Sequence, residues 1–250
     1  MTPEFGAART AIVTGGARRI GCSISRALAA DGWHVLIHHH SSGAQATELA
    51  AELGATTVQA DLVDPAAAGT IMAALEGLPP PALLVNSAAG FDLDQFDDFT
   101  ADQWDRHMAV NARAPALLTQ AFARAVPAGQ GALVVNILDA KLAQPNPDFF
   151  SYTIAKMALA GVTELSARVL AERGIRVCGI APSVTLVSGP QTRDNFEQVH
   201  RLNALQRGVT VEQIVDTLRF LIATPTLTGQ VITLDAGQRF LGLRRDVQFL

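Results

Sequence analysis

The sequence is poor in cysteine and in net charge, and both absences limit what the protein can be. Its two cysteines, Cys22 and Cys178, are too few for a disulfide framework and lack the short paired spacing of a zinc site. The formal charge is only −4, without a basic stripe, which argues against a nucleic-acid partner. No apolar run reaches the roughly 18 residues that span a membrane, and residues 1–9 lack a signal-like apolar stretch. We therefore expect a soluble, cytoplasmic protein with no membrane partner.

Apolar residues make up 49% of the 250 positions, enough for one sizeable core. Short, continuous apolar runs predict strands at residues 10–14, 34–37, 56–59, 82–86, 132–137, 175–180 and 230–234. Helical patterns lie between them: one over about residues 20–31, one that ends at 53, one that opens near 64, and three at about 100–126, 151–172 and 211–223. Such an alternation is typical of a parallel sheet covered on both faces. The sequence predicts a single α/β domain over residues 1–250, with a doubly wound parallel sheet.

A glycine-rich turn follows the first predicted strand. Gly15 and Gly21 are six positions apart, with Arg19 between them, so the spacing differs from the usual Gly-x-Gly-x-x-Gly. A turn of this kind directs backbone N–H groups and the dipole of the next helix at a phosphate. The alternative is that the glycines only permit a tight turn and close helix packing.

The end of the second predicted strand bears on the choice of cofactor. An enzyme that prefers NAD usually has Asp or Glu here, to bind the ribose 2′-hydroxyl, whereas this chain has His40, Ser41 and Ser42. These side chains tolerate a 2′-phosphate, and Arg18 in the glycine turn can neutralise it. We therefore expect NADPH to be preferred over NADH. The triplet 38–40 also suggests a metal site, but neighbouring strand residues point to opposite faces, so we expect no metal.

Tyrosine and lysine are scarce, and their placement is informative. The single tyrosine, Tyr152, lies four residues before Lys156, one of two lysines, so both occupy one face of a predicted helix. A nearby ammonium group is expected to lower the pKa of the phenol and make it a general acid near neutral pH. The alternative is a buried tyrosine packed beside a surface lysine.

Together these motifs resemble the short-chain dehydrogenase/reductase family over almost the whole chain. The matching segments are Thr14-Gly15-x-x-x-Arg19-Ile20-Gly21, Asn86-Ser87-Ala88-Ala89-Gly90, Asn111 and Tyr152-x-x-x-Lys156. The resemblance implies a Rossmann fold that binds NAD(P)(H) and transfers a hydride to or from a carbonyl or imine. It implies that Tyr152 donates the proton, that Lys156 holds the nicotinamide ribose, and that Asn111 supports a water chain behind Lys156.

The resemblance also assigns further cofactor contacts. Residues expected to bind the cofactor are Gly15, Arg18, Arg19, Ile20, Gly21, His40, Ser41, Ser42, Asp61, Leu62, Asn86, Ala88, Tyr152, Lys156 and Pro182. Within this set, Asp61 and Leu62 match the adenine contacts, and Asn86 and Ala88 match the cofactor cleft.

Two departures from the common family pattern resemble the pteridine reductase branch. Arg19 replaces the second loop glycine, and Asp139 stands near the position of the usual catalytic serine. Phe91 falls where that branch stacks an aromatic ring on the pterin. A protonated Asp139, or one that shares a proton with Tyr152, suits delivery of a proton to a ring nitrogen. Arg19 is expected to hold the polar edge of the substrate. The alternative for Asp139 is a turn cap.

Three functions remain open at this point. The first is NADPH-dependent reduction of a pterin or dihydrofolate-like C=N bond. The second is reduction of a carbonyl substrate such as a 3-oxoacyl thioester, which has no ring to stack on Phe91 and no nitrogen for Asp139 to protonate. The third is a regulator that binds NADPH without turnover, which has no need of the pair formed by Tyr152 and Lys156.

Apolar residues also suggest self-association. The helix from residue 151 is apolar around much of its circumference, and the chain ends in apolar segments at 240–243 and 247–250. The resemblance implies a homotetramer whose C-terminal tail covers a partner's site, and the alternative is a tail that folds back onto its own domain. Residues of about 183–208 are expected to form a substrate lid.

Overall fold

The computed structural model describes residues 4–188 and 191–249. Within these residues seven strands form one parallel sheet: β1 (Thr10–Val13), β2 (His34–His39), β3 (Thr56–Gln59), β4 (Pro81–Asn86), β5 (Ala132–Ile137), β6 (Ile175–Pro182) and β7 (Val231–Leu234). The strand order is β3-β2-β1-β4-β5-β6-β7, and each neighbouring pair is parallel. The chain is therefore a single α/β domain with the predicted doubly wound topology.

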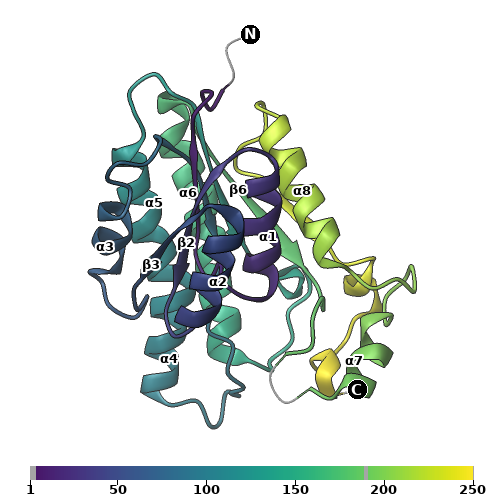
Figure 1. Ribbon diagram of the computed structural model, residues 1–250. Coiled ribbons are helices and arrows are strands. Elements are labelled where there is room, and N and C mark those ends of the chain that lie inside the picture. The colour runs from purple at the N-terminus through teal and green to yellow at the C-terminus, as the bar shows by residue number, and fades with distance from the viewer. Residues whose placement is uncertain (1–3, 189–190, 250) are drawn as a thin grey trace.

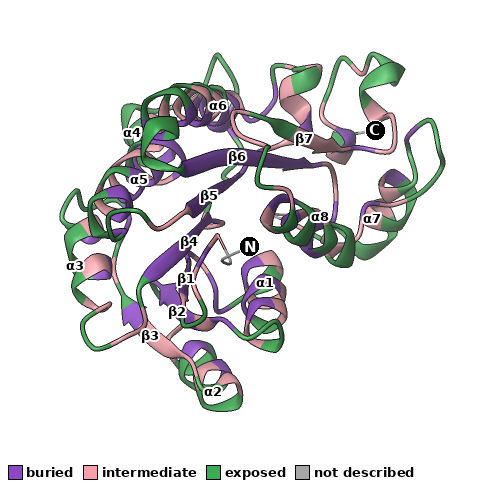
Figure 2. Ribbon diagram, turned by 90° about the horizontal axis from the view of Figure 1, so that it is seen from above, coloured by how far each residue is buried: buried purple, intermediate pink, exposed green. Residues whose placement is uncertain are grey.

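Helices cover both faces of this sheet (Figures 1 and 2). The described helices are α1 (Arg19–Ala30), α2 (Gly43–Leu53), α3 (Ala67–Ala73), α4 (Ala101–Met108), α5 (Ala114–Ala125), α6 (Phe150–Leu170), α7 (Arg193–His200) and α8 (Val211–Ala223). One core packs α1, α2 and α8 on the sheet, and the other packs α3, α5 and α6. Successive residues of β1 point alternately into the two cores: Val13 belongs to the first and Ile12 to the second. A strand buried on both faces has no polar side, which explains its continuous apolar sequence.

The predicted helix over residues 100–126 is interrupted. α4 begins at a capping box formed by Thr100 and Gln103, and a π-helical turn, Ala109–Arg113, separates it from α5. Such turns often occur at functional sites, because the wider turn changes the direction of the side chains that follow. Here the turn contains Asn111.

The segments near the C-terminus lie side by side with α7 (Figure 1). The last described turn, Val247–Phe249, packs against α7 and against the substrate side of the same chain. The tail therefore folds onto its own domain, which was the alternative to the expected position over a partner's site. The predicted lid region contains α7, which the sequence pattern did not predict.

In the part of the chain that the structure describes, no helix is long and apolar enough to cross a membrane.

Candidate active site

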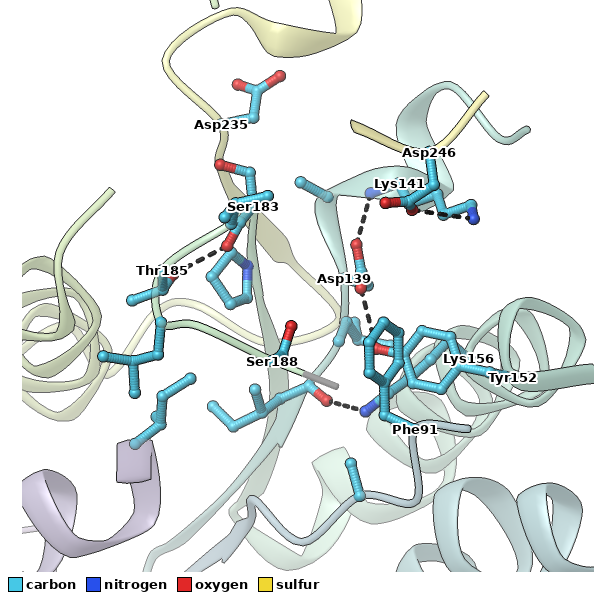
Figure 3. A pocket seen from close by; sticks show the side chains of 18 of the residues that line it. Phe91, Asp139, Lys141, Tyr152, Lys156, Ser183, Thr185, Ser188, Asp235 and Asp246 are labelled. Atoms are coloured by element: carbon cyan, nitrogen blue, oxygen red, sulfur yellow. Dashed lines mark hydrogen bonds and ion pairs between the residues drawn. The ribbon is translucent and has the colours of Figure 1, made fainter. Parts of the chain in front are cut away.

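A cleft of about 620 Å³ opens at the carboxyl end of the sheet, where parallel α/β folds bind their ligands. Its walls come from the glycine turn, the loop after β4, the end of β5, the start of α6, the segment after β6, and the C-terminal segment. Eleven of the predicted site residues line it: Gly15, Arg18, Arg19, Ile20, Gly21, Ala88, Phe91, Asp139, Tyr152, Lys156 and Pro182. Figure 3 shows Phe91, Asp139 and Tyr152 facing one another across from Ser183 and Thr185.

The glycine turn has the form of a phosphate site. Gly15 has a φ of +63°, and a Cβ there would lie 3.1 Å from the Cα of Ala88. A Cβ on Gly21 would overlap the carbonyl oxygen of Gly15. No described side chain caps the start of α1, and its first turn has no acidic residue. The N–H groups at the very start of α1 therefore have no side-chain cap, whereas the Cys22 N–H already donates to the Arg18 carbonyl. The start of the helix thus fits the diphosphate of a dinucleotide.

His38 fixes this turn from β2. The Gly15 N–H donates to its Nδ1 at 3.2 Å, and its Nε2 donates to the Ala60 carbonyl at 3.1 Å. Burial lowers the pKa of His38 to about 4, so the ring is neutral at pH 7. This role could not be predicted from the triplet at 38–40, because nothing in that pattern distinguishes the buried His38 and His39 from the exposed His40. In the described ranges, no three His, Cys, Asp or Glu side chains are grouped as a metal site.

Several predicted cofactor residues lie outside the lining of the cleft, namely His40, Ser41, Ser42, Asp61, Leu62 and Asn86. His40 Nε2 lies 3.8 Å from Asp61 Oδ2, so the ends of β2 and β3 do bring these two side chains together. Asn86 is buried and donates to Asn136 Oδ1 at 2.8 Å. Its side chain therefore joins β4 to β5 instead of lining the cleft.

The reactive side chains meet at the end of β5. Tyr152 Oη donates to Asp139 Oδ2 at 2.9 Å, and the Lys141 backbone N–H donates to Asp139 Oδ1 at 2.8 Å. Lys156 Nζ donates to the Ile137 carbonyl at 2.7 Å. Tyr152 and Asp139 thus form a hydrogen-bonded pair. Lys156 lies near them, on the same helix as Tyr152.

The electrostatics of this pair differ from the expectation for Tyr152. Burial, followed by the charge of Asp139 and its hydrogen bond, raises the pKa of Tyr152 well above its usual value. Burial also raises the pKa of Asp139, and it lowers the pKa of Lys156 to about 8. The expected lowering of the tyrosine pKa by Lys156 was wrong, because the ammonium group is turned to Ile137 and lies 5.7 Å from the phenol ring centroid. The Tyr152 hydroxyl therefore keeps its proton at neutral pH, and the environment of Asp139 favours the neutral carboxyl group relative to an exposed one.

Phe91 forms an aromatic wall beside Tyr152. Its ring stacks on Phe149 with centroids 4.3 Å apart and meets the edge of Tyr152 at 4.8 Å. Phe91 is only partly buried and lines the cleft, so its ring is available to a flat substrate.

Asn111 lies behind this wall and does not line the cleft. Its Oδ1 accepts the Gly90 N–H at 3.1 Å, and its Nδ2 donates to the Gly90 carbonyl at 2.9 Å. It therefore holds the backbone beside Phe91.

A buried polar chain, absent from the sequence analysis, also fixes the loop after β4. Asp94 accepts the backbone N–H of Ser151 at 3.2 Å and the hydroxyl of the same residue. The Ser151 oxygen is 2.6 Å from His107 Nδ1, and the Asp92 N–H donates to His107 Nε2 at 3.2 Å. The residue before α6, Phe149, has a φ of +53° and provides no cap, so Asp94 caps this helix from a distance. Local sequence carries no sign of a cap 57 residues away.

Comparison with known proteins agrees with this architecture. A family model described as enoyl-(acyl carrier protein) reductase matches residues 15–239. The chain is 33% identical to pteridine reductase 1 of Leishmania tarentolae, over 92% of this chain and 96% of that protein. FolM alternative dihydrofolate reductase 1 of Brucella suis, solved in complex with NADP, has a TM-score of 0.89 and 38% identity, covering 96% of this chain and 97% of that one. A blue fluorescent protein from a metagenomic library, solved in complex with NADPH, has a TM-score of 0.84 and 31% identity, covering 92% and 97%.

The fold, the glycine turn and the tyrosine–lysine helix define a reductase of the Rossmann class, and the chain belongs to the short-chain dehydrogenase/reductase family. Within that family it is an NAD(P)-dependent reductase similar to pteridine reductase and FolM.

Proposed function

We propose that the protein reduces a C=N bond of a pterin or a dihydrofolate-like substrate with NADPH. The observation that carries this proposal is the hydrogen bond of 2.9 Å between Tyr152 Oη and Asp139 Oδ2, beside the partly exposed ring of Phe91. Reduction of a C=N bond requires a hydride on carbon and a proton on nitrogen. A proton-rich acid pair next to a surface for a flat ring meets the second requirement and orients the substrate for the first.

In this proposal the chain's own residues supply and position the proton. The Tyr152 hydroxyl gives its proton to the substrate nitrogen, and Asp139 returns one to the phenolate. Lys156 holds the ribose hydroxyls, and Arg19, whose Nη1 donates to the Val187 carbonyl at 2.8 Å, lies where the substrate's polar edge would enter. When bound, NADPH supplies the hydride.

The cofactor preference is proposed on charge. Arg18 is exposed in the glycine turn, and the hydroxyls of Ser41 and Ser42 follow β2 in place of a carboxylate. A 2′-phosphate gains attraction from Arg18 and meets no carboxylate among the residues directly after that strand. These features support NADPH over NADH, and the NADP and NADPH in the similar solved structures support the same choice.

The deciding experiment is NADPH oxidation, measured side by side with dihydrobiopterin, dihydrofolate and an acetoacetyl thioester. We expect turnover of at least one pterin, with a loss of about 100-fold or more in Asp139→Asn, which keeps the side-chain shape but cannot return a proton. Turnover of the thioester alone would support the carbonyl reductase instead. Tight NADPH binding without turnover of any substrate would support a regulatory protein.

We also propose that the protein is a homotetramer and that residues 183–208 cover the substrate. On α6, Leu165 and Val169 are 64% and 75% exposed, which is costly for apolar side chains in a lone chain. Val184 and Leu186 line the cleft, which supports the covering role. Light scattering at micromolar concentration tests the assembly, because a mass near 26.4 kDa would exclude any oligomer.

A further inference from the structure

The C-terminal segment, residues 243–249, forms part of the cleft in its own chain. Four of its residues line the cleft: Leu243, Asp246, Val247 and Gln248. In Figure 3, Asp246 and Lys141 lie on the same side as Asp139, across from Ser183 and Thr185. We propose that this segment is the substrate-side wall of the site, held by Asp148 and Arg245, and that Asp246 is a positioning residue for the acid pair. The inference rests on the proposed function for the identity of the substrate.

Asp148 fastens the segment to the body of the domain. Its carboxylate is buried and accepts the Arg245 Nε–H, with distances of 2.9 and 2.8 Å to the two oxygens. One of these oxygens also accepts the Asp246 N–H at 2.7 Å. Charge-assisted bonds to a buried carboxylate are among the stronger polar contacts in proteins. Loss of Arg245 would leave that carboxylate without its cation and release the segment.

Lys141 connects the segment to the acid pair. Its ammonium group donates to the Asp148 carbonyl and lies 3.4 Å from Asp246 Oδ2, while its backbone N–H donates to Asp139. Four residues thus influence the pKa of Asp139. They are Tyr152 and Lys156 on α6, Lys141 in the turn that follows Asp139, and Asp246 on the C-terminal segment. Asp246 pairs with Lys141 and places a negative charge near Asp139.

Aromatic packing also connects the C-terminal segment to the proposed position of the substrate ring. Phe249 lies against Phe149 with centroids 6.2 Å apart and an interplanar angle of 22°. Phe149 in turn stacks on Phe91 at 4.3 Å. The ring proposed to stack on the substrate is therefore supported, through one intermediate ring, by the end of the chain.

The contacts of the segment are confined to the substrate side. In the described residues, no hydrogen bond or ion pair joins 243–249 to the glycine turn at 15–21, whereas bonds run to Asp148, Lys141 and Ser188. Release of the segment should thus weaken substrate binding and leave the affinity for NADPH unchanged.

The test compares Arg245→Ala with Arg244→Ala, the adjacent arginine, for which the structure shows no hydrogen bond or ion pair in the described residues. For Arg245→Ala we expect the KM of the reduced substrate to rise about fivefold or more, with the NADPH Kd within twofold of the parent value. Arg244→Ala should match the parent in both. An unchanged substrate KM in Arg245→Ala would overturn the inference, as would an equal loss of NADPH affinity.

A second variant, Asp246→Asn, tests the link to the acid pair through the pH profile. Loss of this negative charge removes a contribution that keeps the pKa of Asp139 high and leaves Lys141 without its carboxylate partner. The alkaline limb of the kcat profile should move to lower pH by about half a unit, and an unmoved limb would refute the positioning role. The comparison uses whichever substrate the parent reduces. Failure of the parent with every pterin would contradict the proposed function, and failure of these shifts would contradict this inference alone.

Discussion

The free energy of unfolding should fall as the pH falls, because His38 is held neutral in the folded protein. The size of this effect follows from the difference between the pKa of His38 in the folded and unfolded states. In the folded state Nδ1 accepts the Gly15 N–H and the ring is buried, so the pKa falls from 6.5 to about 4. The unfolded chain takes up the proton first, near pH 6.5. The contribution of neutral His38 is therefore fully present above that pH and is lost as the pH falls toward 4.

Each pKa unit corresponds to about 1.4 kcal/mol. The linkage relation then gives a loss of about 2 kcal/mol in the free energy of unfolding between pH 7 and pH 5 from this residue alone. His38→Gln removes the titration while it keeps an acceptor and a donor at the end of the side chain. The variant should therefore lose about 2 kcal/mol less than the parent over the same interval.

Urea unfolding at pH 7 and pH 5, followed by the fluorescence of Trp33 and Trp104, measures this difference. His40→Gln is the matched control, because His40 is two residues away and exposed. It should retain the parent's pH dependence. Equal losses in His38→Gln and the parent would refute the assignment of the acid sensitivity to His38.

Three further predictions concern the site. Tyr152→Phe should bind NADPH as the parent does but lose about 100-fold or more in kcat, and normal turnover in this variant would contradict the role of Tyr152 as proton donor. Lys156→Met should weaken NADPH binding and also lower kcat. The double change Ser41→Asp and Arg18→Ala should narrow the preference for NADPH over NADH, and equal Michaelis constants in the parent would contradict the charge argument. Asp94→Asn should lower the melting temperature and raise the substrate KM without changing the NADPH Kd, because it weakens the cap beside Tyr152; an unchanged melting temperature would contradict the distant cap.

The sheet was largely predictable from the sequence, because its strands are buried on both faces. β3 and β5 have the predicted limits, and β2 is longer than predicted because it continues through His38 and His39. Neither residue fits an apolar run, yet both are buried. The short helix α7 was missed because its sequence, Arg193–His200, is polar and lies in a segment rich in turn-forming residues.

The site was predictable only where its residues are close in sequence or match a family motif. The pair Tyr152 and Lys156 follows from helical spacing, and Asp139 follows from the resemblance. Asp246 and Lys141 are 105 residues apart, and their contact depends on the path of the C-terminal segment, which no local pattern encodes. The sequence does contain one indication that Lys141 belongs to the site, because it is one of only two lysines and follows Asp139 by two positions.

The arrangement of the two lysines explains why the proposed site acts as an acid. Lys156 donates to the Ile137 carbonyl, and Lys141 is held by Asp246 and by the Asp148 carbonyl. In the described structure neither ammonium group bonds to the carboxylate of Asp139, whose donors are a backbone N–H and the hydroxyl of Tyr152. A partly buried carboxyl group without a cationic partner favours its neutral form. The same residue beside a bound cation would be a carboxylate that accepts protons. In the proposed reaction, Asp139 would instead support proton donation to a nitrogen that gains negative charge as the C=N bond is reduced.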